Sequence, residues 1–254
     1  MRRQTIFVVL TTQRSGSGWL VDLLDDHPAI ASYAEMFRVT DMTVSDYGAT
    51  AVPRFEVMVG QRAFSTAPGL VVRRHAYVRG LARAHPEALA VGFKLMYDQT
   101  RDHPGLMSIL ALTRARFIHL VRRDTLSAVV SFDIASERDR WHYHAGQPIP
   151  PLRVRMDTKS LLERLQRRDT EVERFRRRLA RMRVAVHEVA YEDLVARREE
   201  TLSEVLEFLG VPQPTLPLRS SLVRPTPARA ADLVENKADI RAALAGTPYA
   251  ELAR

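Results

Sequence analysis

The sequence predicts an α/β protein with a parallel sheet that helices cover on both faces. Short β-branched and apolar runs, typical of strands buried on both faces, alternate with helical patterns along the chain. This alternation is typical of parallel sheets, whose ligand sites lie at the carboxyl ends of the strands. A length of 254 residues with 46% apolar content suits one domain over residues 1–254 and excludes a disordered or fibrous chain.

The first unit is a strand, a loop of small residues and a helix. Residues Thr5–Leu10 form a continuous apolar run, as expected for a buried parallel strand. Apolar residues then recur at helical spacing over Trp19–Leu24. This helix is expected to end near His27, because the residue before a proline disfavours the helical conformation.

Further apolar runs predict the other buried strands. They cover Ala90–Tyr97, Phe117–Val121 and Val184–Val189. Helical patterns lie between them, near residues 54–65, 70–84, 103–114 and 124–139. Each strand is therefore followed by a helix, as a parallel sheet requires.

The second half of the chain is predicted to be mainly helical. Apolar spacing predicts a long helix over Thr158–Arg183, whose arginines interleave with acidic residues and so favour a solvated, salt-bridged face over a nucleic-acid surface. A helix over Glu192–Leu209 is expected to end at Gly210. Residues 211–229 contain five prolines and predict a loop, before a last helix near 231–245.

The charge of the chain is carried mainly by arginine. The net charge is +8, and 35 of the 38 basic residues are arginines. Arginine suits bidentate recognition of phosphate and sulfate, although a GC-rich genome produces the same bias. Charge alone therefore does not identify the partner.

Two absences limit the cellular setting. Without cysteine the chain has no disulfide framework and no thiolate nucleophile or metal ligand. The first apolar run, Ile6–Leu10, is too short for a signal sequence or a membrane span. We therefore expect a cytoplasmic protein without a transmembrane segment.

The loop over residues 11–19 has the composition of an anion site. It lies between a buried strand and the start of a helix, where small residues let backbone N–H groups converge on an anion. Ser15 and Ser17 add hydroxyl groups and Arg14 adds a positive charge. The loop does not match G-x-x-x-x-G-K-[ST], which disfavours a Walker NTPase, and it does not match G-x-G-x-x-G either.

Several segments resemble sulfotransferases that use 3′-phosphoadenylyl sulfate (PAPS). The sequence Arg14-Ser15-Gly16-Ser17-Gly18-Trp19-Leu20 resembles their 5′-phosphosulfate loop, and residues 119–131 are similar to their 3′-phosphate motif, with Arg123 followed by Ser131. Three further segments look like the bacterial carbohydrate branch, which includes the trehalose and Nod-factor sulfotransferases. They are Val91–Tyr97, Tyr191–Leu194 and Glu235–Tyr249.

The resemblance implies a P-loop-like sheet that binds PAPS as co-substrate and releases adenosine 3′,5′-bisphosphate (PAP). The residues implied in binding are Arg14, Ser15, Gly16, Ser17, Gly18, Trp19, Arg123, Ser131, Tyr191 and Arg224, with Arg229 an equal alternative to Arg224. Gly18 departs from the pattern, because a residue with a hydroxyl group is common there. Trp19 is expected to stack on adenine, with packing of the helix onto the sheet as the alternative.

Sulfuryl transfer needs a base for the acceptor hydroxyl and positive groups around the transferred group. The resemblance implies Glu35 as general base, with His142 or His144 as alternatives. Lys94, inside an apolar strand, is expected to reach the sulfuryl group or a carboxylate, and Arg14 the bridging oxygen. The sequence contains no histidine, aspartate and glutamate residues at the spacing of metal ligands, and we expect the reaction to need no metal ion.

The sequence therefore predicts a PAPS-dependent sulfotransferase. The acceptor is expected to be a carbohydrate or glycolipid hydroxyl, with residues 136–151 as an aromatic acceptor loop or, alternatively, a helix end packed on the core. Peripheral membrane contact is allowed, and no nucleic-acid partner is expected. Two alternatives are a nucleotide or small-molecule kinase and an arginine-rich module that binds polyanions.

Overall fold

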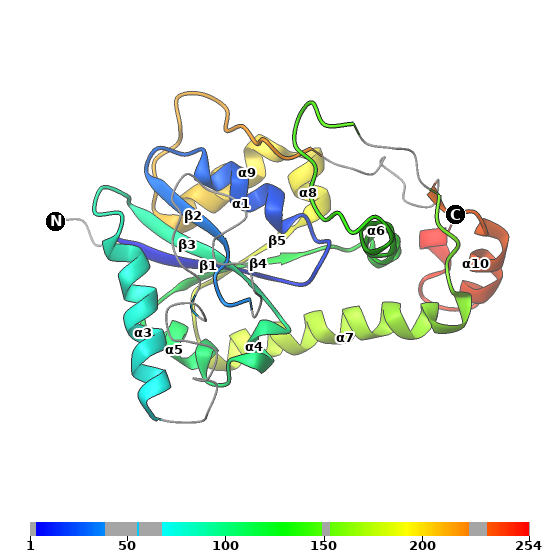
Figure 1. The fold of residues 1–254 in the computed structure, drawn as a ribbon, viewed down its shortest axis with the longest axis horizontal. Coiled ribbons are helices and arrows are strands. Elements are labelled where there is room, and N and C mark those ends of the chain that lie inside the picture. Colours follow the sequence, from blue (N-terminus) through cyan, green and yellow to red (C-terminus); the bar gives the residue numbers. More distant parts are fainter. Residues whose placement is uncertain (1–3, 39–54, 56–67, 149–152, 224–232, 254) are drawn as a thin grey trace.

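The computed structural model describes residues 4–38, 55, 68–148, 153–223 and 233–253. Its centre is a five-stranded parallel sheet in the order β2-β3-β1-β4-β5 (Figure 1). The strands are β1 (Thr5–Thr11), β2 (Ile30–Glu35), β3 (Ala90–Met96), β4 (Arg116–Val121) and β5 (Val186–Ala190). Because all strands are parallel, their carboxyl ends lie at one edge of the sheet.

Helices cover both faces of this sheet (Figure 1). One face packs on α3 (Pro68–Arg83), α5 (Leu106–Leu112) and the second half of α7 (Thr158–Met182), through side chains such as Phe93 and Phe175. The other face packs on α1 (Ser17–Asp25), α8 (Tyr191–Ala196) and α9 (Arg198–Leu209), through side chains such as Phe7 and Leu206. The predicted fold class is therefore confirmed.

A third apolar cluster lies beside the sheet. It joins α6 (Thr125–Glu137), the first half of α7, α10 (Lys237–Leu244) and the short 3-10 helix Ala250–Ala253. Figure 1 shows α6 and α10 next to the same end of α7. This cluster fixes α6, which follows β4 and carries Ser131.

A hydrogen-bonded chain of side chains ties α7 to the sheet. The Tyr97 ring stacks on Phe175 with 4.0 Å between centroids, and its hydroxyl lies 2.6 Å from His119 Nε2. His119 Nδ1 lies 3.1 Å from Glu188 Oε2, which also accepts a hydrogen bond from Arg176 of α7. These hydrogen bonds, from His119 first and then Arg176, lower the pKa of Glu188 to about 2.

The predicted strands are all present, with ends shifted by at most two residues. Three predicted helices differ in extent, and one additional short helix is present. The expected helix over 192–209 is divided into α8 and α9 at Arg197, whose φ of −134° and ψ of 53° are not helical. This break lets α8 continue from the end of β5 while α9 turns back onto the sheet.

The last helix starts later than predicted, at Lys237. The 103–114 pattern corresponds to the shorter α5, and a separate short helix, α4 (Gln99–Asp102), follows β3. The expected helix over 54–65 lies outside the described residues except for Phe55, which is buried among Phe37, Tyr77 and His103.

Candidate active site

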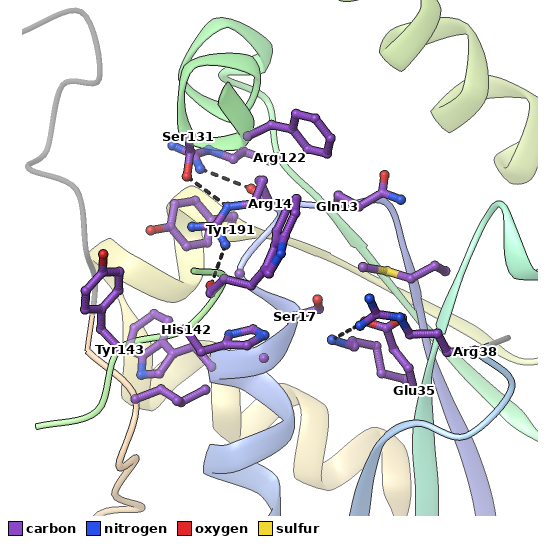
Figure 2. Close-up of a pocket in the computed structure, with 18 of the residues that line it drawn as sticks. Gln13, Arg14, Ser17, Glu35, Arg38, Arg122, Ser131, His142, Tyr143 and Tyr191 are labelled. Atoms are coloured by element: carbon purple, nitrogen blue, oxygen red, sulfur yellow. Dashed lines mark hydrogen bonds and ion pairs between the residues drawn. The ribbon is translucent and has the colours of Figure 1, made fainter. Parts of the chain in front are cut away.

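A pocket of about 690 Å³ lies at the carboxyl ends of the strands, above the start of α1 (Figure 2). The β1–α1 loop forms its floor. Glu35 and Lys94 enter it from β2 and β3, Ser131 from α6 and Tyr191 from α8. This is the edge of the sheet where the alternating pattern predicted a site.

The β1–α1 loop has a geometry suited to an anion. Arg14 and Gly16 both have left-handed backbone conformations, with φ of 60° and 81°, and α1 begins at Ser17. Left-handed residues interleaved with right-handed ones turn successive N–H groups toward one point, and the helix dipole adds positive potential there. For Arg14, which has a Cβ, this conformation is strained, and such strain is common at functional sites.

Tyr191 closes the loop from the other side. A Cβ atom on Gly16 would lie only 2.3 Å from Cδ2 of the Tyr191 ring, so a glycine is required at this position. Ser17 and Gly18 line the pocket next to it. Ser15 is fully buried beneath the loop, and its hydroxyl has no hydrogen-bond partner among the described residues.

The Arg14 side chain joins three parts of the pocket. Its Nε donates to Ser131 Oγ at 3.0 Å and its NH1 donates to the Trp141 carbonyl oxygen at 2.7 Å. Arg14 and Ser131, expected to bind opposite ends of one nucleotide, are therefore side by side (Figure 2). One guanidinium thus links the anion loop to α6 and to the loop over residues 138–148.

Two further arginines hold the anion loop. Arg122 at the end of β4 donates to the Arg14 carbonyl oxygen at 3.1 Å, and its guanidinium lies 4.6 Å from the centre of the Tyr191 ring. Arg168 of α7 donates to the Gln13 carbonyl oxygen at 2.8 Å. Burial and the nearby Arg122 lower the pKa of Arg168 to about 10. This concentration of positive charge favours an anionic ligand.

A buried ion pair faces the anion loop across the pocket (Figure 2). Lys94 Nζ lies 2.9 Å from Glu35 Oε1, and the two side chains are 3% and 15% exposed. The pairing of β2 with β3 is regular up to Tyr33 opposite Phe93, and then Glu35 instead of Ala34 stands opposite Lys94. This β-bulge turns Glu35 to the face of the sheet from which Lys94 extends.

The loop over residues 138–148 closes one side of the pocket. Trp141, His142 and Tyr143 line it, whereas His144 is exposed and does not. The His142 Cε1 atom would contact a Cβ on Gly18 at 3.2 Å, which places the imidazole over the start of α1. Burial, followed by the charges of Lys94 and Arg14, lowers the pKa of His142 to about 3, so this histidine is neutral at pH 7.

Most of the site residues predicted from sequence line this one pocket. They are Arg14, Gly16, Ser17, Gly18, Trp19, Glu35, Lys94, Ser131 and Tyr191. Trp19 also packs against the apolar cluster between α1 and the sheet, so the two roles considered for it are compatible. Arg224 lies outside the described residues.

Arg123 is not brought into the pocket. Its side chain is 63% exposed and pairs with Asp193, 2.7 Å away. The adjacent Arg122 is 9% exposed and lines the pocket instead. The sequence motif indicates Arg123 rather than Arg122, because two consecutive arginines end the strand and the motif spacing selects the second.

No cluster of three or more histidine, aspartate or glutamate side chains suited to a metal ion occurs in the described part of the chain. Among the same residues, no helix combines the length and the apolar character that crossing a membrane requires.

The pocket defines a class of protein, a parallel α/β protein with a loop suited to an anionic ligand at the end of its first strand. Residues 6–215 match the model of the sulfotransferase family. The chain therefore belongs to the sulfotransferase family, and its activity is sulfo-group transfer.

Similar proteins cover nearly the whole chain. Nodulation protein H of Rhizobium tropici is 25% identical over 245 residues, which are 96% of this chain and 91% of that protein. Nodulation protein H of Rhizobium meliloti (strain 1021) is 24% identical over 246 residues, 96% of this chain and 93% of that protein.

Solved structures share the fold. The sulfotransferase domain from the curacin biosynthetic pathway has a TM-score of 0.52 and 16% identity, covering 85% of this chain and 77% of that chain. A sulfotransferase from Alicyclobacillus acidocaldarius has a TM-score of 0.51 and 15% identity, and the match covers 96% of this chain and 94% of that chain. At these identities the likeness concerns the fold.

Proposed function

We propose that the protein transfers the sulfo group of PAPS to a hydroxyl group of a carbohydrate or glycolipid and releases PAP. One observation carries this proposal: a buried Glu35–Lys94 pair and an arginine-rich anion loop face each other across one pocket. A base beside a cation, opposite an anion site, is the arrangement that an in-line transfer to a hydroxyl needs.

The anion loop and its arginines would hold the donor. Backbone N–H groups of residues 15–19 and the start of α1 suit the 5′-phosphosulfate, with Arg14 near the bridging oxygen. Ser131 and an arginine at the end of β4 suit the 3′-phosphate. Because Arg122 lines the pocket and Arg123 does not, we favour Arg122 for this contact. Trp19 and Tyr191 offer aromatic faces for the adenine.

Glu35 would take the proton of the acceptor hydroxyl. As the acceptor oxygen bonds to sulfur, the bond from sulfur to the phosphate oxygen breaks and the electron pair leaves with PAP. Lys94 and Arg14 stabilise the negative charge that develops on the oxygens around sulfur. The proton then lies on the Glu35 carboxyl group, and the acceptor leaves as a sulfate ester.

The loop over residues 138–148 is the proposed acceptor wall. Trp141 and Tyr143 provide aromatic surfaces against which sugar rings pack, and His142 provides a neutral hydrogen-bonding group. The similarity to two proteins named nodulation protein H over nearly their whole length supports an acceptor of the carbohydrate class that the sequence motifs indicate.

The test is mass spectrometry of candidate sugars and glycolipids incubated with PAPS, in search of a sulfo adduct. Glu35→Gln should lower turnover by about 10²–10⁴ with PAP affinity retained, because the base acts only in the transition state. Glu87→Gln, at a 67% exposed position outside the pocket, is the matched control. Near wild-type turnover of Glu35→Gln would refute the assignment and direct attention to His142.

Ligand-binding experiments on the same protein distinguish this proposal from the two alternative functions. Stabilisation by ATP with magnesium but not by PAP would favour a kinase. Salt-dependent binding to DNA or heparin without a saturable nucleotide site would favour a polyanion-binding module. Saturable, stabilising binding of PAP supports the proposal.

A further inference from the structure

The turn between β3 and α4, formed by Tyr97 and Asp98, and Gln99 at the start of α4 connect the anion loop to Glu35. Asp98 and Gln99 both line the pocket beside Glu35. Neither residue belongs to a segment that the sequence motifs single out. Their hydrogen bonds give this turn a role in placing the Glu35 carboxylate.

The orientation of the Gln99 amide is fixed by the backbone. The Met96 backbone N–H points at Gln99 Oε1 at 3.1 Å. A backbone N–H can only donate, so the atom that faces it must be the amide oxygen. The NH2 group of Gln99 must then face Glu35, where Nε2 lies 2.7 Å from Oε2. Gln99 is 4% exposed, so water does not compete freely for this amide.

Both oxygens of Glu35 therefore accept from a fixed donor. Lys94 contacts Oε1 and Gln99 contacts Oε2. Each contact favours the ionised carboxylate, and together they fix the plane of the carboxylate group. A base that is ionised and oriented before the acceptor binds loses less entropy when it takes the proton.

The same turn is bonded to the anion loop. Asp98 is the N-cap of α4, and its Oδ1 accepts a hydrogen bond from the Gln99 backbone N–H at 2.9 Å. Its other oxygen, Oδ2, accepts a hydrogen bond from Gln13 Nε2 at 2.7 Å. Gln13 lies directly before Arg14 in the loop. A continuous path of hydrogen bonds thus runs from the anion loop through Asp98 and Gln99 to Glu35.

We propose that Gln99 is a positioning residue for the reaction, which holds the Glu35 carboxylate ionised and fixed in register with the anion loop through Asp98. This inference rests on the proposed function, in which Glu35 is the base. In this role Gln99 acts through Glu35.

Two substitutions at Gln99 separate this role from simple packing. Gln99→Met keeps the length of the side chain and removes the donor to Glu35. Gln99→Glu retains an acceptor for the Met96 N–H and replaces the donor by a group that repels the carboxylate. Both changes disfavour ionised Glu35, and the second does so more strongly.

The expected result is an ordered shift of the pH–rate profile. The acidic limb of kcat/KM should move up by about one pH unit in Gln99→Met and further in Gln99→Glu, since one lost hydrogen bond to a charged group corresponds to about one unit or more. Turnover at pH values below the limb should fall by about tenfold, with PAP affinity within about twofold of the wild type. A packing defect would lower the rate at all pH values and leave the limb in place.

Other titrating groups around the pocket are common to all variants. The charged or titratable side chains that line it near Glu35 are Lys94, Arg14, Arg38, Asp98, Asp102 and His142. His142, with a pKa of about 3, does not titrate in the range of the assay. A shift in Gln99→Met therefore reports the lost hydrogen bond, and a shift in Gln99→Glu belongs to the pair of carboxyl groups at positions 35 and 99.

Gln4→Met is the matched control. Gln4 is partly buried, and its amide donates to the carbonyl oxygens of His85 and Ala88, but it lies at the end of β1 away from the pocket. Its loss should lower the melting temperature without moving the acidic limb. An unmoved limb in both Gln99 variants would overturn the proposal.

The Glu35→Gln variant distinguishes failure of this inference from failure of the proposed function. If Glu35→Gln keeps wild-type turnover, the base assignment fails and the inference with it. If Glu35→Gln loses turnover while the Gln99 variants keep the wild-type profile, only the positioning role is refuted. In the Glu35→Gln background, adding Gln99→Met should cost less than it costs alone, because the pair acts as a unit.

Discussion

Replacement of Lys94 by methionine tests whether the ion pair contributes to stability and to transfer separately. Methionine keeps the length of the lysine stem and removes the charge. Lys94 is 3% exposed and Glu35 15% exposed, so the substitution leaves a carboxylate in a place that water reaches poorly. Removing one partner of a buried ion pair typically costs about 3–5 kcal/mol.

The structure places the expected cost at the lower end of that range. Glu35 retains its hydrogen bond from Gln99, and its pocket opens to solvent. We therefore expect a loss of about 3 kcal/mol, which for a chain of this size lowers the melting temperature by about 6–12 °C.

The double variant Lys94→Met/Glu35→Gln isolates the chemistry. With both charges gone, most of the lost stability should return, because no charged group is then left buried without its partner. Sulfo transfer should stay at least about 10²-fold below the wild type. Urea and thermal unfolding measure the first quantity and mass spectrometry of the product the second.

Three results would refute this reasoning. A melting temperature of Lys94→Met within about 2 °C of the wild type would show that the pair is not buried and coupled. Additive losses of stability in the double variant would likewise show that the two side chains are not coupled. Recovery of turnover together with stability would show that neither side chain takes part in the transfer.

The remaining predictions concern the donor site and the anchor of α7. Arg122→Ala should weaken PAP binding by about 10- to 100-fold in calorimetry, and it should weaken binding of adenosine 5′-phosphosulfate less. A larger loss of PAP affinity in Arg123→Ala would assign the 3′-phosphate contact to Arg123. PAP should raise the melting temperature equally with and without EDTA, because side chains and N–H groups supply the positive charge; a loss of the effect in EDTA would require a metal site. Glu188, whose pKa the hydrogen bond from His119 lowers to about 2 from 4.5, should contribute stability above about pH 4.5 and lose it as the pH falls toward 2. The stability gap between wild type and Glu188→Gln in urea unfolding should therefore close with falling pH, and a gap that is constant from pH 6 to 3 would contradict this.

The parts of the fold that sequence predicts are those with local causes. Continuous apolar runs such as Thr5–Leu10 have no solvent-facing positions, so they predict buried strands whatever surrounds them. Gly210 ends α9 with φ of 74°, as its position predicts. The break at Arg197 has no glycine or proline to mark it, and the change of direction comes from packing of α9 on the sheet.

The candidate site likewise has a part that the sequence predicts and a part that it does not. The anion loop is contiguous, so its sequence contains the whole arrangement from Arg14 to Trp19. The contacts of Gln99 and Asp98 join residues 64 and 85 positions apart in the chain, and no local pattern encodes them. Their signal is confined to the short polar segment directly after a buried strand, where parallel sheets place functional side chains.

The choice between Arg122 and Arg123 shows a different limit. Consecutive residues at a strand end point in opposite directions, and which one enters the pocket depends on where the strand stops. β4 ends at Val121, and Asp124 begins α6 by accepting a hydrogen bond from the Ser127 N–H. With both ends of the intervening turn fixed, Arg122 faces Tyr191 and Arg123 faces Asp193.

The two donors on Glu35 raise a question of chemistry, because groups that stabilise a carboxylate also make it a weaker base. In sulfuryl transfer this cost is limited. The acceptor hydroxyl becomes acidic as its oxygen bonds to sulfur, so a weak base takes the proton once the bond is partly formed. Free hydroxyls are weak acids, and a stronger base would gain little before that point. Lys94 and Gln99 therefore contribute by holding the carboxylate ionised and in one orientation, and the timing of proton removal is set by the forming bond to sulfur.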